Sequence, residues 1–64
     1  MQINIEKLKR EMERAGINNN AEFADRLEMT RQAIDYILAQ KTTTFKTINK
    51  MAEVLDVDAK DLLK

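Results

Sequence analysis

Apolar residues recur at intervals of three and four along most of the chain, and this spacing predicts helices rather than strands. The first stripe, over residues 5–15, consists of Ile5, Leu8, Met12 and Ala15. Gly16 follows it as a candidate left-handed stop, and Asn4 precedes it as a candidate N-cap. A first helix is therefore expected over residues 5–15.

Two further helices are expected close together in the next part of the chain. Asn19 is a candidate N-cap with Glu22 three residues later, and an inward face is then formed by Phe23, Ala24 and Leu27. After the short connection "EM", Thr30 can cap a third helix over residues 31–39, with Met29 and Ile34 spaced as a hydrophobic staple. Only three or four residues separate the two helices, which is typical of a helix-turn-helix.

The same spacing predicts two more helices after a break at residues 42–44. A fourth helix over residues 45–55 is expected to bury Phe45, Ile48, Met51, Ala52 and Leu55. Asp58 is a candidate cap for a last turn or two over "AKDLL", with Val57 and Leu62 spaced as a staple. Proline is absent, glycine occurs once and no segment alternates with a period of two, so the expected fold is all-α, with five short helices in a single domain spanning residues 1–64.

The third helix has a polar face opposite its apolar one. On a wheel of about 100° per residue, Ile37 and Leu38 fall close to Ile34, whereas the opposite side holds Gln32, Tyr36 and Ala39. Arg31, Ala33 and Asp35 flank this outer strip. The outer strip is either solvated surface or a contact face.

The side chains of this strip are suited to contact with the major groove of DNA. Arginine can bond guanine and glutamine can bond adenine through two hydrogen bonds, and alanine leaves room for a thymine methyl group. These chemistries correspond to Arg31, Gln32 and Ala33, and Tyr36 can reach a phosphate or pack on a base edge. The surrounding groups that can hold phosphates are the amide nitrogens at the starts of the second and fourth helices and the side chains of Thr30, Lys41, Thr42, Thr43, Thr44 and Lys46.

Solvated surface explains part of the same pattern. Thr30 is accounted for fully as a cap, and Asp35 places a carboxylate where phosphates would approach, which is unfavourable unless it accepts from a cytosine amino group. Tyr36 favours a contact, because a large exposed aromatic side chain on a small domain commonly marks one.

The distribution of charge is more informative than its total. Eleven basic and eleven acidic residues cancel. Residues 30–50 nevertheless carry four Lys or Arg against one Asp, a balance of +3, while residues 1–29 sum to −1 and residues 51–64 to −2. The segment around the third helix is basic and its flanks are not.

Composition excludes several classes of protein. Without cysteine or histidine there is no disulfide and no zinc site, and no metal or other cofactor is expected. An enzyme is not expected, because the chain has no glycine-rich phosphate loop and its carboxylate pairs sit two residues apart. The start "MQINIEKLKR" has no apolar run of the signal-peptide kind, and no stretch is long enough to span a membrane, so a cytoplasmic protein is expected.

The chain resembles the DNA-binding domain of the phage Cro and repressor-type helix-turn-helix family from about Leu8 to Leu63. The matching stretches are "LKREMERAG", "FADRLEMTRQAIDYI" and "TINKMAEVLDVDAKDLL". The resemblance implies a compact five-helix lambda-repressor-like domain. It also implies that the third helix contacts DNA through Thr30, Arg31, Gln32, Ala33 and Tyr36, with Thr30 on a phosphate and the other four reading bases. Further phosphate contacts are implied for Asn19, Asn20 and the segment Lys41 to Lys46.

The chain departs from the family pattern at three places. Glu28 stands where the family commonly has the glycine of the turn, so Glu28 is expected to adopt a positive φ. Gln40 replaces the glycine that usually follows the third helix. The three asparagines indicate a one-residue insertion before the second helix, where relatives have a phosphate-contacting glutamine.

The leading hypothesis is a small phage or bacterial transcriptional regulator that binds double-stranded DNA sequence-specifically, as a homodimer on a pseudo-palindrome. No strand-like tail follows Lys64, so a dimer is expected to use the fifth helix, the first helix or the DNA itself, with exposed Val54, Ala59 or Leu63 as candidates. The alternative is an antirepressor or antitoxin-like module that uses the same face to bind a partner protein, such as a repressor. Zero net charge and Asp35 favour this alternative.

Overall fold

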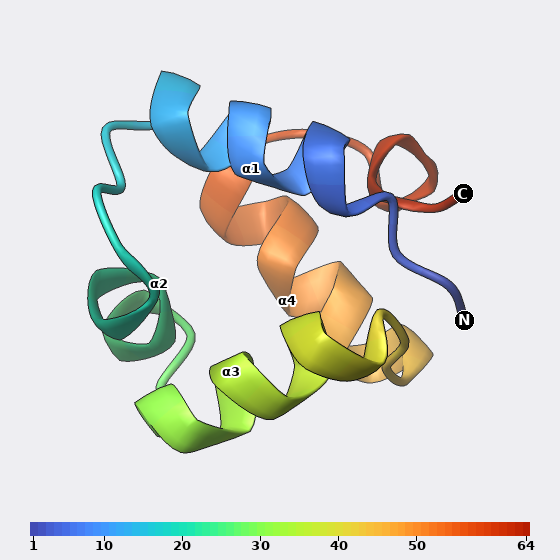
Figure 1. Ribbon diagram of the computed structural model, residues 1–64. Coiled ribbons are helices and arrows are strands. Elements are labelled where there is room, and N and C mark those ends of the chain that lie inside the picture. Colours follow the sequence, from blue (N-terminus) through green and yellow to red (C-terminus); the bar gives the residue numbers. More distant parts are fainter.

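Four α-helices and one 3-10 turn make up the computed structural model, which describes residues 1–64 (Figure 1). The elements are α1 (Ile5–Arg14), α2 (Asn20–Arg26), α3 (Arg31–Gln40), α4 (Phe45–Leu55) and η1 (Ala59–Leu62). The expected fifth helix is therefore wrong as an α-helix. Asp58 occupies its N-cap position but its side chain makes no capping hydrogen bond, and the four residues of η1 are too few to propagate an α-helix.

Three of the four α-helices begin at the cap that the sequence indicated, and α4 begins at Thr44, in the predicted break. Asn4, Asn19, Thr30 and Thr44 are the N-caps, and each side-chain oxygen accepts from the amide N–H three residues on, at 2.8 to 3.3 Å. Glu22 completes the start of α2, although its Oε2 accepts from the N–H of Asn18 (3.0 Å) and not from that of Asn19. A cap of this kind is worth about 1 kcal/mol.

Left-handed residues end or follow the helices. Gly16 (φ 79°) ends α1 and Glu28 (φ 58°) lies in the turn between α2 and α3, so both expectations for these positions are confirmed. The left-handed residue after α3 is Lys41 (φ 60°), because Gln40 is still helical, and Asp56 (φ 56°) ends α4.

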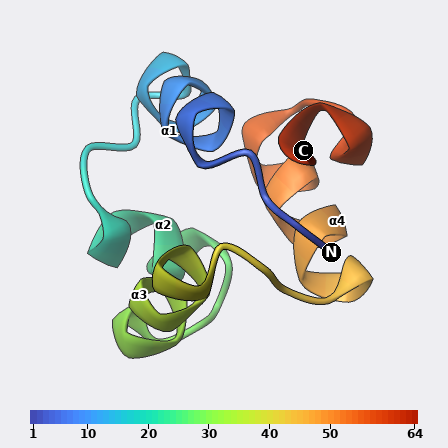
Figure 2. The same cartoon turned by 45° about the vertical axis from the view of Figure 1, so that its right-hand side comes forward.

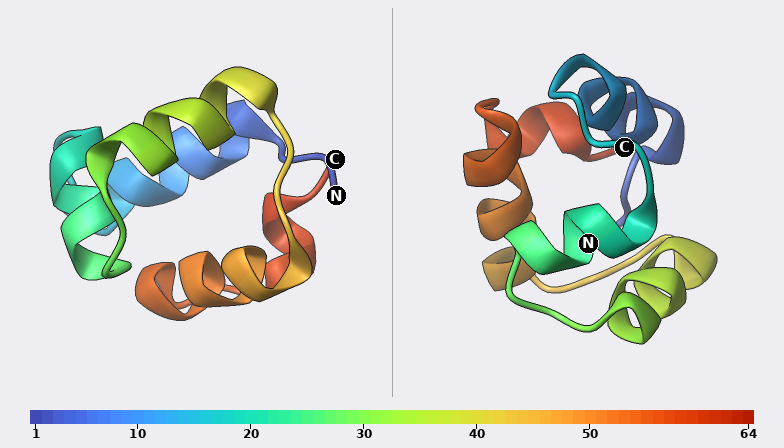
Figure 3. Two further views of the ribbon diagram at one scale, coloured as in Figure 1. Left: turned by 90° about the horizontal axis from the view of Figure 1, so that it is seen from below. Right: turned by 90° about the vertical axis from the view of Figure 1, so that its left-hand side faces the viewer.

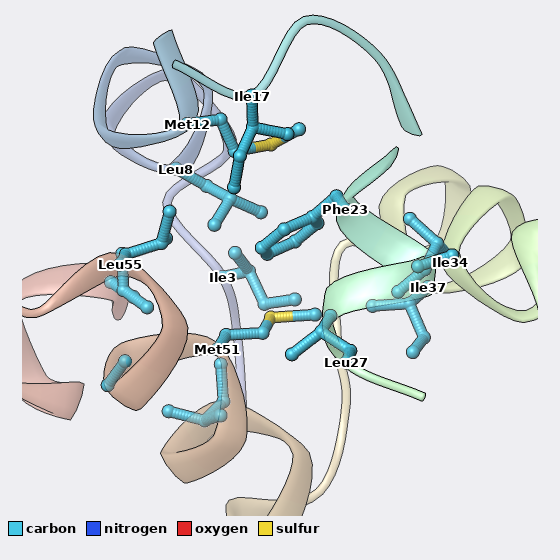
Figure 4. Close-up of a cluster of buried hydrophobic side chains, with 14 residues drawn as sticks. Ile3, Leu8, Met12, Ile17, Phe23, Leu27, Ile34, Ile37, Met51 and Leu55 are labelled. Carbon is cyan, nitrogen blue, oxygen red and sulfur yellow. The ribbon is translucent and has the colours of Figure 1, made fainter. Parts of the chain in front are cut away.

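The core contains fourteen buried apolar side chains that converge from all the elements (Figure 4). They are Ile3, Leu8, Met12, Ile17, Phe23, Ala24, Leu27, Ile34, Ile37, Ile48, Met51, Ala52, Leu55 and Leu62. Ile3 and Ile17 lie outside the helices, where the helical stripes gave no sign of them. No charged or polar side chain is buried, which fits a domain with few residues to spare for its core.

Two positions of the predicted stripes are exposed, and a third is only partly buried. Phe45 is 58% exposed, so its predicted burial is wrong. It is the first residue of α4 and stands at the end of the stripe, where no second element covers it. Ala15, the C-cap of α1, is exposed, and Ile5 is only half-buried.

The first four residues tie two distant parts of the chain together. Gln2 forms an antiparallel bridge with Thr42, and Ile3 forms one with Leu63, so the two ends of the chain lie side by side (Figures 2 and 3). The bridging hydrogen bonds are Ile3 N to Lys41 O (2.9 Å), Thr43 N to Met1 O (3.1 Å), Asn4 N to Leu62 O (2.9 Å) and Lys64 N to Gln2 O (3.1 Å). The loop between α3 and α4 is thereby fixed to the body of the molecule.

The apolar side chains considered for a dimer are not freely exposed. Val54, Ala59 and Leu63 are half-buried and pack against the core, so the expectation that they are exposed is wrong. Their contacts with the core arise because η1 packs on both α1 and α4.

Candidate functional site

The outer face of α3 is open. Ile34 and Ile37 face the core, whereas Gln32, Tyr36 and Ala39 are exposed, Tyr36 to 66%. When the molecule is viewed from below, α3 lies nearest the viewer and no other segment crosses in front of it (Figure 3, left). The predicted exposure of this face is confirmed.

Arg31 and Asp35 form an ion pair on one side of this face. Arg31 Nε donates to Asp35 Oδ2 over 3.4 Å, from one turn of α3 to the next. The other carboxylate oxygen of Asp35 accepts from Asn20 Nδ2 at 3.0 Å. A shallow depression is lined by the same residues, namely Asn19, Asn20, Ala21, Arg31 and Asp35. The sequence gave no sign of the contact between Asn20 and Asp35, which are 15 residues apart.

The threonines around α3 differ in whether their hydroxyl hydrogen is free to donate a hydrogen bond. Thr30 Oγ1 accepts from the N–H of Ala33, so its own hydrogen is free. Thr42 donates its hydroxyl hydrogen to the carbonyl oxygen of Met1 (2.8 Å), and Thr44 donates to Thr47 Oγ1 (3.2 Å). Thr43 is half-buried, and no hydrogen bond engages its hydroxyl. Thr30 and Thr43 therefore retain a donor, while Thr42 and Thr44 are occupied.

The lysines of the basic segment also divide into two kinds. Lys41 and Lys46 are exposed on either side of the loop between α3 and α4, and neither is paired with an acidic residue. Lys50 instead donates from Nζ to the main-chain carbonyl of Leu27 at the end of α2 (3.1 Å). Lys41 and Lys46 thus carry the unpaired positive charge beside α3.

Comparison with known protein families shows which family the chain belongs to. The family model of the Cro/C1-type HTH DNA-binding domain matches residues 7–64. The chain belongs to this family. No curated protein and no solved structure matches the chain. Cro/C1-type domains bind double-stranded DNA and serve in regulation, so this chain contains the DNA-binding domain of a regulator.

The Cro/C1-type match begins at residue 7, so the bridging segment 1–4 lies before it. Within the matched part, α2 and α3 are the helix-turn-helix pair, and they pack directly against each other. Leu27, which follows α2, and Ile34, in α3, are both fully buried in the core. α3 is thereby packed against α2 with its polar side outward.

Two further features of this Cro/C1-type domain concern what it lacks. No group of three or more His, Cys, Asp or Glu side chains is placed so as to hold a metal ion. None of the helices combines the length and the apolar composition needed to cross a bilayer.

Proposed function

We propose that the protein is a sequence-specific transcriptional regulator that inserts α3 into the major groove of its operator. The observation that carries this proposal is the uncovered ridge of Arg31, Gln32 and Tyr36 on a helix whose opposite side is locked into the core. A major groove about 12 Å wide admits one α-helix, and the side chains near the N-terminal end of that helix meet the base edges.

The four base-contacting residues in this proposal are Arg31, Gln32, Ala33 and Tyr36. The arginine fork matches the O6 and N7 atoms of guanine, and the glutamine amide matches N6 and N7 of adenine. Ala33 is half-buried, and its methyl group leaves space for a thymine methyl beside the helix. Tyr36 lies one turn further along and can reach a phosphate or a base edge.

Phosphate contacts are proposed at both ends of α3. At its start, the free hydroxyl hydrogen of Thr30 and the side-chain amide of Asn19 can donate to one strand. Beyond its end, Lys41, Lys46 and the Thr43 hydroxyl can hold the other strand, together with the main-chain amides that open α4. Asn20, Thr42 and Thr44, which the sequence also predicts as phosphate contacts, hold Asp35, the loop and the start of α4 in this proposal.

A homodimer on a pseudo-palindromic operator is part of the proposal. One domain offers few positive charges to DNA, so a single copy is expected to bind weakly. Two copies on half-sites about one helical turn apart double the number of phosphate and base contacts.

The alternative function is that of an antirepressor or antitoxin-like module, which would bind a partner protein through the same face of α3. The exposed carboxylate of Asp35, 45% accessible at the edge of this face, favours a protein surface over a phosphate backbone. The two functions predict opposite results in one experiment.

That experiment is a titration of fluorescently labelled duplexes, including random-sequence DNA, at two salt concentrations. A DNA-binding regulator binds at low salt and loses affinity steeply as salt rises, with a log–log slope of about −0.9 per neutralised phosphate. Absence of binding at low salt would reject the proposal and favour a partner protein.

A further inference from the structure

Asp35 is the only acidic residue between Glu28 and Glu53, and it lies in the face proposed to meet DNA. A carboxylate so close to phosphates weakens binding unless it does something that offsets the repulsion. Both of its oxygens are engaged, Oδ1 by Asn20 and Oδ2 by Arg31. The carboxylate is therefore held from two helices at once.

The contact with Asp35 constrains Arg31, a long and exposed side chain among the proposed base contacts. Arg31 is the first residue of α3 and its side chain is 70% exposed, so no packing against the body of the protein fixes its torsions. The bond from Nε to Asp35 occupies the inner edge of the guanidinium group and leaves the terminal nitrogens Nη1 and Nη2 free to donate. These two nitrogens form the fork that matches O6 and N7 of guanine.

Asn20 fixes the carboxylate itself. It is the first residue of α2, and its side-chain nitrogen lies 3.0 Å from Asp35 Oδ1. Because α2 and α3 pack against each other, the contact with Asn20 fixes the carboxylate relative to both helices and not to α3 alone. The chain of contacts from Asn20 through Asp35 to Arg31 thus sets the direction of the guanidinium group before DNA arrives.

We propose that Asp35 is a positioning residue that presents Arg31 end-on to a guanine, so that each operator half-site contains a G·C pair opposite Arg31. The inference rests on the DNA-binding function proposed above. An arginine fixed in its bound geometry loses less freedom on binding, and it discriminates better against bases that do not match its fork. Asp35 then lowers the affinity for DNA of any sequence and raises the selectivity for guanine at one base pair.

The test uses the full chain and a preferred duplex selected from random-sequence DNA. The base pair opposite Arg31 is identified as the one at which Arg31→Ala abolishes the preference for guanine. Dissociation constants are then measured for this duplex, for its three single-base variants at that pair, and for a random-sequence duplex. The proteins compared are the wild type, Asp35→Ala, Asp35→Asn, Arg31→Ala and the double variant Arg31→Ala/Asp35→Ala.

Asp35→Ala is expected to reduce the preference for guanine at this pair by about tenfold, since a bidentate pair discriminates by roughly that factor or more. Affinity for the random-sequence duplex should stay the same or rise, because a negative charge has been removed. In the Arg31→Ala background, the loss of Asp35 should change no base preference. Asp35→Asn keeps the shape and one acceptor oxygen, so it should lie between the wild type and Asp35→Ala, and it serves as the second variant should Asp35→Ala fold poorly.

Asp61→Ala is the matched control, because it removes the same charge from η1, on a different element. It should leave the preference for guanine unchanged. The proposal is overturned if Asp35→Ala strengthens binding to all duplexes by one factor and keeps the preference for guanine, since Asp35 would then act only as a repelling charge. It is also overturned if Arg31→Ala alters no base preference. Failure of the wild type to prefer any duplex would instead reject the DNA-binding function itself.

Discussion

Lys50 Nζ of α4 lies 3.1 Å from the main-chain carbonyl oxygen of Leu27, the C-cap residue that follows α2. The last carbonyl groups of a helix have no partner within the helix, and a positive charge there also complements the helix dipole. Lys50 is one of the four basic residues of the segment 30–50. In the structure it holds α4 against the helix-turn-helix pair.

Replacing Lys50 with methionine should therefore lower stability. The substitution keeps most of the side-chain bulk but removes the donor and leaves the Leu27 carbonyl without it, at a cost of about 1 kcal/mol. Urea denaturation followed by circular dichroism measures the change. Lys9→Met is the control, since Lys9 is exposed on α1 and makes no hydrogen bond or ion pair, and its effect should stay within about 0.5 kcal/mol. Equal losses in the two variants would show that the contact of Lys50 contributes nothing.

Ile3 should be as important to stability as a core residue of a helix. It is 2% exposed and its backbone bridges the loop after α3 to the end of the chain. Ile3→Ala is expected to lower the free energy of unfolding by about 2–5 kcal/mol. Ile5→Ala, two residues along and only half-buried, should cost clearly less. A smaller loss for Ile3→Ala than for Ile5→Ala in urea denaturation would contradict this role of the first residues.

Thr30 is expected to contribute to folding and to DNA binding through different atoms. Its Oγ1 accepts from Ala33, and its hydroxyl hydrogen remains free to donate. Thr30→Ala should therefore lower stability by about 1 kcal/mol and also weaken binding to every duplex. Thr30→Ser retains both atoms and should restore both properties. Thermal melting and duplex titration measure the two effects. An unchanged melting temperature for Thr30→Ala would contradict the capping role.

Lys46 is predicted to hold a phosphate without selecting a base. Lys46→Ala should weaken binding to specific and random duplexes by the same factor. It should also reduce the steepness of the log–log dependence of affinity on salt by about 0.9 for each bound copy. Lys60→Ala removes the same charge from η1 and should leave the slope unchanged. A change of base preference in Lys46→Ala, or an unchanged slope, would count against a phosphate contact at this position.

Local features of the fold could be predicted from the sequence. The N-caps at Asn4, Asn19 and Thr30 depend on residues three positions apart, and the positive φ of Glu28 is expected from the family resemblance, which places a glycine at this position of the turn. Phe45 shows where local reasoning fails, because periodicity indicates which side of a helix is apolar but not how far the neighbouring elements extend over it.

Features that depend on distant segments could not be predicted. Ile3 belongs to no helical stripe, and its burial arises from bridges to residues near 42 and 63. The outward direction of Gln32 and Tyr36 followed from the wheel, but the partner of Asp35 did not, because Asn20 approaches only when α2 and α3 pack together. The same holds for Lys50 and Leu27, which are 23 residues apart.

The central claim is that the exposed side of α3 selects the DNA sequence, and Gln32 lies at the middle of that side. The most direct measurement compares the duplexes that wild-type protein and Gln32→Ala each enrich from the same pool of random-sequence DNA. The wild type should enrich two half-sites about one helical turn apart, and Gln32→Ala should lose its preference at one base pair of each half-site, with a cost of about 1–3 kcal/mol on the wild-type sequence. Enrichment of the same sequence by both proteins, with equal affinity, would contradict the claim.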